Sequence, residues 1–157
     1  MSVASATREL PAATRGTVQR ITLTLTPQSA ARAGLVVRRS ADGAIGTRIV
    51  YDTARQTLTL DRSQSGEANF SNAFSRQHIV NLPLQNGRLP LEIVVDRGSV
   101  EVFAGHGRTA ITDLIFPPGD ADRVAVFAEH GGATFGGLTV TNLAGPDDAG
   151  RACDAPR

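Results

Sequence analysis

Two runs of acidic, basic and hydroxyl side chains follow apolar, strand-like stretches, and they carry the residue types most able to do chemistry. The runs are Asp61-Arg62-Ser63 and Asp96-Arg97-Gly98-Ser99. A further carboxylate, Glu101, lies two residues beyond the second run. Residues of these types could turn the chain, hydrolyse a glycosidic bond or bind the hydroxyl groups of a sugar.

The turn is the interpretation that the local sequence favours, because Asp and Ser side chains accept hydrogen bonds from the backbone that follows them. Hydrolysis by the retaining route needs two carboxyl groups about 5–5.5 Å apart, one with a raised pKa. Asp61 and Asp96 each precede an Arg, which would lower the carboxyl pKa. The sequence therefore predicts no catalytic residue. Sugar recognition stays open, since Arg and carboxylates form charge-assisted hydrogen bonds with hydroxyl groups.

The elements that would position these residues are strands. Residues 21–26 (ITLTLT) alternate apolar and Thr side chains, and about ten short segments repeat this period of two. Turn signals separate them, among them Asp42-Gly43, Asn86-Gly87 and Gly131-Gly132. No segment keeps a helical apolar stripe. The pattern predicts an all-β fold with two stacked antiparallel sheets, a β-sandwich.

Composition restricts the possible partners. The 16 basic residues are all Arg and are scattered, and the net charge is +1, so the basic stripe of a nucleic-acid-binding protein is missing. No apolar run reaches the roughly 20 residues of a membrane helix. The three His residues and Cys153 do not have the spacing of metal ligands. We expect no cofactor and no metal, although the carboxylates of Asp120 and Asp122 leave calcium open.

Three segments are expected along the chain. Residues 1–16 lack periodicity and are predicted to be a flexible flank, residues 17–143 the sandwich, and residues 144–157 a flexible tail. The candidate aromatic platforms for a sugar are Tyr51, Phe70, Phe74 and, more weakly, His78. Phe103 and Phe127 alternate with Val and are expected to pack in the core. Asp113 shares a face with Ile111, so we expect an Arg or backbone partner for it.

Three longer stretches resemble the C-terminal β-sandwich of family-32 glycoside hydrolases, the invertases, inulinases and levanases. They are YDTARQTLTLDRSQSG, LPLEIVVDRGSVEVFAGHGRTAITDLIFP and VAVFAEHGGATFGGLTVTNL. The resemblance covers about residues 17–143, and Gly98 is its one departure, because Ser is more frequent there in the family. It implies a sandwich of the concanavalin-A-like lectin (jelly-roll) type. The catalytic motifs of the family lie in a separate β-propeller, and none of them occurs in this sequence, which lacks Trp and Asp-Pro.

The resemblance implies a non-enzymatic role with two alternatives. One is a carbohydrate-binding module for fructan of the levan type that recognises terminal fructosyl units, as in the related family-66 modules. The other is a structural accessory domain of a fructan hydrolase, whose catalytic domain would be the partner. The family also implies an extracellular or periplasmic location. The ligand residues expected at the matched motifs are Asp61, Arg62, Asp96, Arg97 and Glu101.

Overall fold

The structure, a computed structural model, describes residues 1–66 and 75–143. These residues form ten strands and one short 3-10 helix, η1. The elements are β1 (Ser2–Glu9), η1 (Ala12–Thr14), β2 (Val18–Thr26), β3 (Arg32–Arg39), β4 (Thr47–Asp52), β5 (Thr57–Asp61), β6 (Gln77–Asn81), β7 (Leu89–Asp96), β8 (Ser99–Ala104), β9 (Thr109–Leu114) and β10 (Arg123–Asn142). No helix in these ranges is long and apolar enough to cross a membrane.

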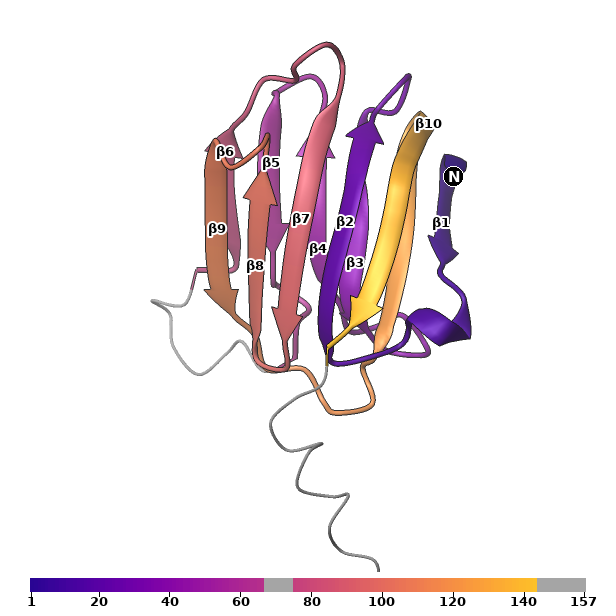
Figure 1. Ribbon diagram of the computed structural model, residues 1–157, viewed down its shortest axis with the longest axis vertical. Helices are drawn as coiled ribbons and strands as arrows, with labels where there is room; N and C mark the ends of the chain where they lie inside the picture. The colour runs from indigo at the N-terminus through magenta and orange to yellow at the C-terminus, as the bar shows by residue number, and fades with distance from the viewer. Residues whose placement is uncertain (67–74, 144–157) are drawn as a thin grey trace, which may run out of the picture.

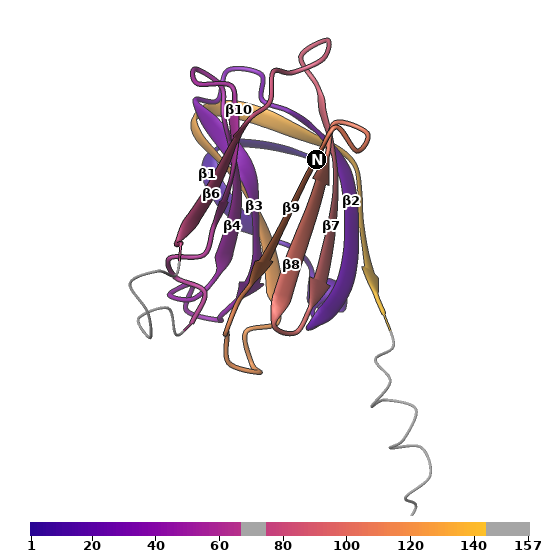
Figure 2. The same ribbon diagram turned by 90° about the vertical axis from the view of Figure 1, so that its left-hand side faces the viewer.

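The strands form two facing layers, so the predicted all-β antiparallel sandwich is confirmed (Figures 1 and 2). The hydrogen-bonded order is β6-β5-β4-β3-β10-β2-β7-β8-β9, and β1 pairs with β10. The first part of β10 pairs with β3 in one layer and its last part with β2 in the other. A sheet of this many twisted strands folds back on itself to bury one face.

The alternating sequence decides which side chains face the interior. In β2, Ile21, Leu23 and Leu25 are buried, whereas the Thr residues between them face outward. The same alternation in β7 and β8 buries Ile93 and Val102 against the opposite layer. Residues with a period of two thus build one core and leave one face of each layer to solvent.

The long strand β10 differs from the prediction, which places a turn at Gly131-Gly132 between two strands. The chain bends here but keeps pairing, with His130 at φ 54° and Gly131 at φ 140°. A Cβ atom at position 131 would overlap the carbonyl group of Ser29, so only Gly allows this close approach. The two glycines therefore bend one strand across both layers.

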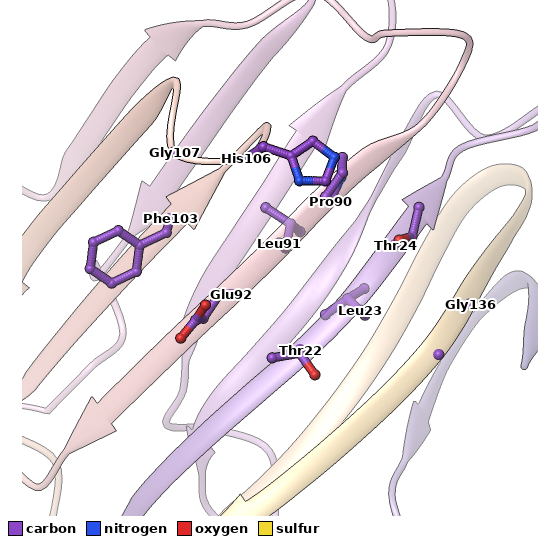
Figure 3. Close-up of a pocket in the computed structure, with 11 residues that line it drawn as sticks. Thr22, Leu23, Thr24, Pro90, Leu91, Glu92, Phe103, His106, Gly107 and Gly136 are labelled. Atoms are coloured by element: carbon purple, nitrogen blue, oxygen red, sulfur yellow. The ribbon is translucent and has the colours of Figure 1, made fainter.

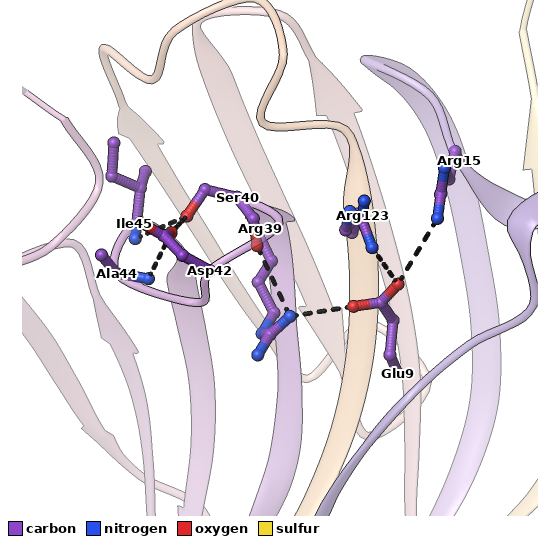
Figure 4. Close-up of polar contacts among 8 residues, drawn as sticks. All are labelled: Glu9, Arg15, Arg39, Ser40, Asp42, Ala44, Ile45 and Arg123. Carbon is purple, nitrogen blue, oxygen red and sulfur yellow. Dashed lines mark hydrogen bonds and ion pairs between the residues drawn. The ribbon is translucent and has the colours of Figure 1, made fainter.

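The N-terminal residues also differ from the predicted flexible flank, because Ser2–Glu9 pairs with β10 as strand β1. Glu9 fixes its end, accepting hydrogen bonds from Arg123 (2.7 Å) and Arg39 (2.9 Å), with Arg15 at 3.8 Å (Figure 4). Alternation is weak in this segment since only Val3 of the strand is buried. Backbone pairing with β10 and the ion pairs of Glu9, rather than a buried apolar face, hold strand β1 in place. The predicted tail, residues 144–157, lies outside the described residues.

Candidate functional site

The first predicted run, Asp61-Arg62-Ser63, forms a turn at the end of β5. Asp61 Oδ1 accepts hydrogen bonds from the backbone N–H (2.9 Å) and Oγ (2.6 Å) of Ser63, and Gln77 donates to Oδ2 (3.0 Å). Burial raises the carboxyl pKa of Asp61, but these hydrogen bonds outweigh it, so the net shift is downward. Asp61 is thus an ionised turn residue, the opposite of a general acid.

Arg62 is buried and joins the two layers where the sandwich is open. Its Nε donates to the Ser75 carbonyl oxygen (2.6 Å) and its Nη1 to that of Leu114 at the end of β9 (2.8 Å). Its Nη2 lies 3.8 Å from the carboxylate of Asp113, which His78 of β6 approaches to 3.6 Å. The expectation of an Arg partner for Asp113 is therefore confirmed. This contact set ties β5 and β6 to β9.

The second run forms the β7–β8 hairpin turn, where Asp96 pairs with Ser99 and Arg97 has φ 40°. The carbonyl group of Arg97 accepts a hydrogen bond from the buried guanidinium of Arg38. Arg38 also donates to the carbonyl groups of Ala121 (2.6 Å) and Pro118 (2.9 Å). The turn interpretation thus fits both runs, which lie at the same end of the sandwich on either side of residues 114–122.

A hollow also lies away from the two runs, on the outer face of the layer that contains β2, β7 and β8. It has a volume of about 550 Å³. Thr22 and Thr24 line one side, Phe103 the other, and Glu92 lies between them (Figure 3). His106, from the turn after β8, lies at the upper rim beside Pro90. Hydroxyl, carboxylate, imidazole and aromatic groups therefore meet at one solvent-facing surface.

Strand register places these side chains in one row across the sheet. Thr22 pairs with Glu92, and Glu92 pairs with Phe103. The expectation that Phe103 packs in the core is wrong, because Val100 and Val102 face inward and the residues that alternate with them must face outward. This parity is visible in the sequence and would have identified Phe103. Phe127 is buried, as predicted.

One ion pair crosses this outer face. Arg20 Nε donates to Glu92 Oε1 at 2.8 Å, with both side chains exposed to solvent. The hydrogen bond from Arg20 lowers the pKa of the Glu92 carboxyl group, and the same contact raises the pKa of Arg20. Glu92 is therefore a charged acceptor, held in place at the floor of the hollow.

The remaining predicted site residues are divided between three places. Glu101 and Asp96 face outward from β8 and β7 on the same layer as the hollow. Tyr51 does not fit a platform, because its ring is fully buried and its hydroxyl donates to the Leu82 carbonyl group (2.8 Å). Phe70 and Phe74 lie outside the described residues.

Four carboxyl groups of the described residues have a pKa below its ordinary value, which favours the ionised form rather than the protonated form that a general acid needs. In Asp42 and Glu92 a hydrogen bond is the largest cause of the lowered pKa. In Asp61 and Glu129 burial raises the pKa, but hydrogen bonds and neighbouring Arg residues together outweigh it. In residues 1–66 and 75–143 no three His, Cys, Asp or Glu side chains gather as metal ligands.

Comparison with known proteins gives a family for nearly the whole chain. The family described as "Glycosyl hydrolases family 32 C terminal" matches residues 2–142. An extracellular exo-inulinase of Aspergillus niger is 41% identical over 125 residues, which are 78% of this chain and 23% of that protein. A levanase of Bacillus subtilis is 37% identical over 120 residues, 76% of this chain and 17% of that protein. The chain thus spans less than a quarter of these relatives.

Solved structures agree with this assignment. The exo-inulinase from Aspergillus awamori superposes with a TM-score of 0.71 at 30% identity, over 90% of this chain and 29% of that one. The carbohydrate-binding module CBM66 from Bacillus subtilis superposes with a TM-score of 0.61 over 90% of this chain and 95% of that module. At 10% identity the second likeness shows a shared fold alone.

Proposed function

The chain belongs to the family of C-terminal domains of family-32 glycosyl hydrolases, and we propose that it is a non-catalytic carbohydrate-binding module for fructan. Fructan of the levan type is the proposed ligand, bound through terminal fructosyl units. The proposed ligand class comes from relatives that are named exo-inulinase and levanase. We also propose a location outside the cell, because the exo-inulinase relatives are named extracellular. Fold by itself does not define a ligand, so the site must carry the argument.

The hollow on the outer face is the observation that carries this proposal. Sugar recognition combines an apolar surface for C–H groups with charged and hydroxyl groups for the sugar hydroxyls. Phe103 offers the ring, the carboxylate of Glu92 accepts, and Thr22, Thr24 and His106 can donate. These groups lie at solvent, so a sugar can reach them without rearrangement of the core.

The predicted ligand residues enter this proposal in two ways. Glu101 and Asp96 share the outward face with the hollow, and Arg97 lies in the turn directly after Asp96. We assign them contacts with parts of the ligand outside the hollow. Asp61 and Arg62 already bind Ser63, Gln77 and the carbonyl groups at the open edge. Their contribution is to hold the sandwich in shape.

A structural accessory domain is the second candidate. The chain spans 23% of the exo-inulinase and 17% of the levanase, so most of each relative lies outside the matched region. At the end of the sandwich, Leu114 and Phe116 are 60% and 45% exposed, an apolar surface that a catalytic domain could cover.

Migration in native gels that contain levan or inulin distinguishes the two candidates. A binding module is retarded by the polymer, and added fructose relieves the retardation if terminal units are recognised. The Phe103→Ala variant should be retarded much less than the unmodified chain, whereas Phe116→Ala should be retarded to the same extent as the unmodified chain. A folded protein that migrates freely in both polymers contradicts the binding proposal and leaves the accessory role.

A further inference from the structure

The outer face of β2, β7 and β8 continues beyond the hollow towards the end of the sandwich. The row that contains Glu92 and Phe103 is followed by a second row, in which Arg20 pairs with Val94 and Val94 with Glu101. Thr112 of β9 completes this second row beside Glu101. All four of these side chains alternate with core residues and therefore face outward.

A third row follows at the β7–β8 turn, where Asp96 pairs with Ser99 and Ser99 with Leu114. Successive rows are two residues apart along each strand, which is about 7 Å. That distance is of the order of one sugar unit in an extended chain. The three rows therefore provide a strip on which consecutive units can meet similar groups.

The chemistry repeats from row to row. Each row offers one carboxylate as an acceptor, Glu92, Glu101 and Asp96 in turn, and each also offers a hydroxyl group or an apolar surface. Arg20 links the first two rows, since it stands in the second row and its Nε donates to Glu92 of the first. Repetition of this kind suits a ligand that repeats.

We propose that this strip binds an oligofructosyl segment of roughly three units lengthwise along β7 and β8. This inference rests on the proposed function and adds a binding mode to it. The first unit lies on Phe103 in the hollow, the second contacts Glu101 and Thr112, and the third reaches Asp96 at the turn. A single fructose fills only the first position.

Calorimetric titration with fructose and with oligomers of two, three and four fructosyl units tests the binding mode. The dissociation constant should fall about tenfold from fructose to the trimer, which corresponds to about 1.4 kcal/mol, and should not fall further for the tetramer. Glu101→Gln and Thr112→Ala should remove most of this gain, weakening the trimer by a much larger factor than fructose. Thr59→Ala, at an outward position of β5 in the other layer, is the matched control and should change neither.

The outcomes separate the binding mode from the proposed function. Equal dissociation constants for fructose and the trimer overturn the strip and keep a site for single terminal units. The strip is also overturned if Glu101→Gln raises the dissociation constants of fructose and of the trimer by the same factor. If neither ligand binds to the folded chain, the proposed function fails and the strip fails with it.

Discussion

Arg62 and Arg20 each meet a carboxylate, yet Arg62 is buried at the open edge of the sandwich and Arg20 lies on its outer face. The side chain of Arg62 is 10% exposed and also donates to the carbonyl groups of Ser75 and Leu114, whereas that of Arg20 is 55% exposed and meets only Glu92 among the described contacts. Buried charges that lose a partner are costly, while exposed pairs contribute little to stability. The ion pair at the open edge therefore stabilises the fold, whereas the exposed pair on the outer face contributes little to stability and belongs to the site that we propose for a ligand.

Removal of the Arg62 side chain should have the largest effect. In Arg62→Ala the carboxylate of Asp113 loses its buried partner and two carbonyl groups lose their donor. We expect a loss of about 3 kcal/mol in the free energy of unfolding, measured by urea denaturation. Arg55→Ala, at an exposed turn, is the control and should change it by less than about 0.5 kcal/mol. If Arg62→Ala lost no more free energy of unfolding than Arg55→Ala, the buried contacts of Arg62 would not stabilise the fold.

Removal of the Phe103 ring should act on binding and spare the fold. Phe103→Ala takes away the apolar surface of the hollow, so levan retention should weaken about tenfold or more, equivalent to about 1.4 kcal/mol. The ring lies outside the core, and the urea midpoint should move little. Unchanged retention in this variant would show that the outer face is not the site.

The buried Tyr51 gives a sharper version of the same contrast. Tyr51→Phe removes the hydroxyl group that donates to the Leu82 carbonyl group, and the free energy of unfolding should drop by about 1 kcal/mol. Levan retention should not change, because the ring has no exposed surface. If Tyr51→Phe lost levan retention while its free energy of unfolding stayed the same, Tyr51 would be a ligand residue after all.

The smallest expected effect concerns the pH dependence of the Arg20–Glu92 pair. Because the hydrogen bond from Arg20 lowers the pKa of Glu92, the folded state favours the ionised form. The contribution of the pair to the stability of the folded state is therefore fully present above the ordinary pKa of Glu. It is lost as the pH falls through the lowered pKa. Levan retention should stay constant at neutral pH and weaken as the pH falls below the ordinary pKa of Glu, because a protonated Glu92 no longer offers a charged acceptor to the sugar.

Glu92→Gln tests the origin of this pH dependence, since the amide does not titrate. In this variant the low-pH loss of retention should shrink, although the retention itself should be weaker throughout. A variant that keeps the full low-pH loss would assign it to other carboxylates. Asp61 would be the first of these to test, because its pKa is also lowered.

Much of the fold could be predicted from the sequence, because alternation and β-branched residues define strands locally. Strand β1 escaped prediction since only Val3 of it is buried, and its order depends on Glu9 meeting Arg residues distant in sequence. The site was harder. Asp61 and Arg62 have the right chemical types, yet burial and partners, which depend on tertiary contacts, decide whether they are available. Phe103 was predictable from parity with the buried Val102, whereas the hollow beside it arises from the curvature and register of three strands.

Mapping of backbone amide shifts by NMR, with a fructosyl trimer added to the ¹⁵N-labelled chain, tests the central claim most directly. We predict that the amides of Thr22, Glu92 and Phe103 on β2, β7 and β8 shift with a common dissociation constant, while that of Arg62 stays in place. Shifts that gather at residues 61–66 and 114–118, with the outer face unaffected, would contradict the account and return the sugar site to the charged end of the sandwich.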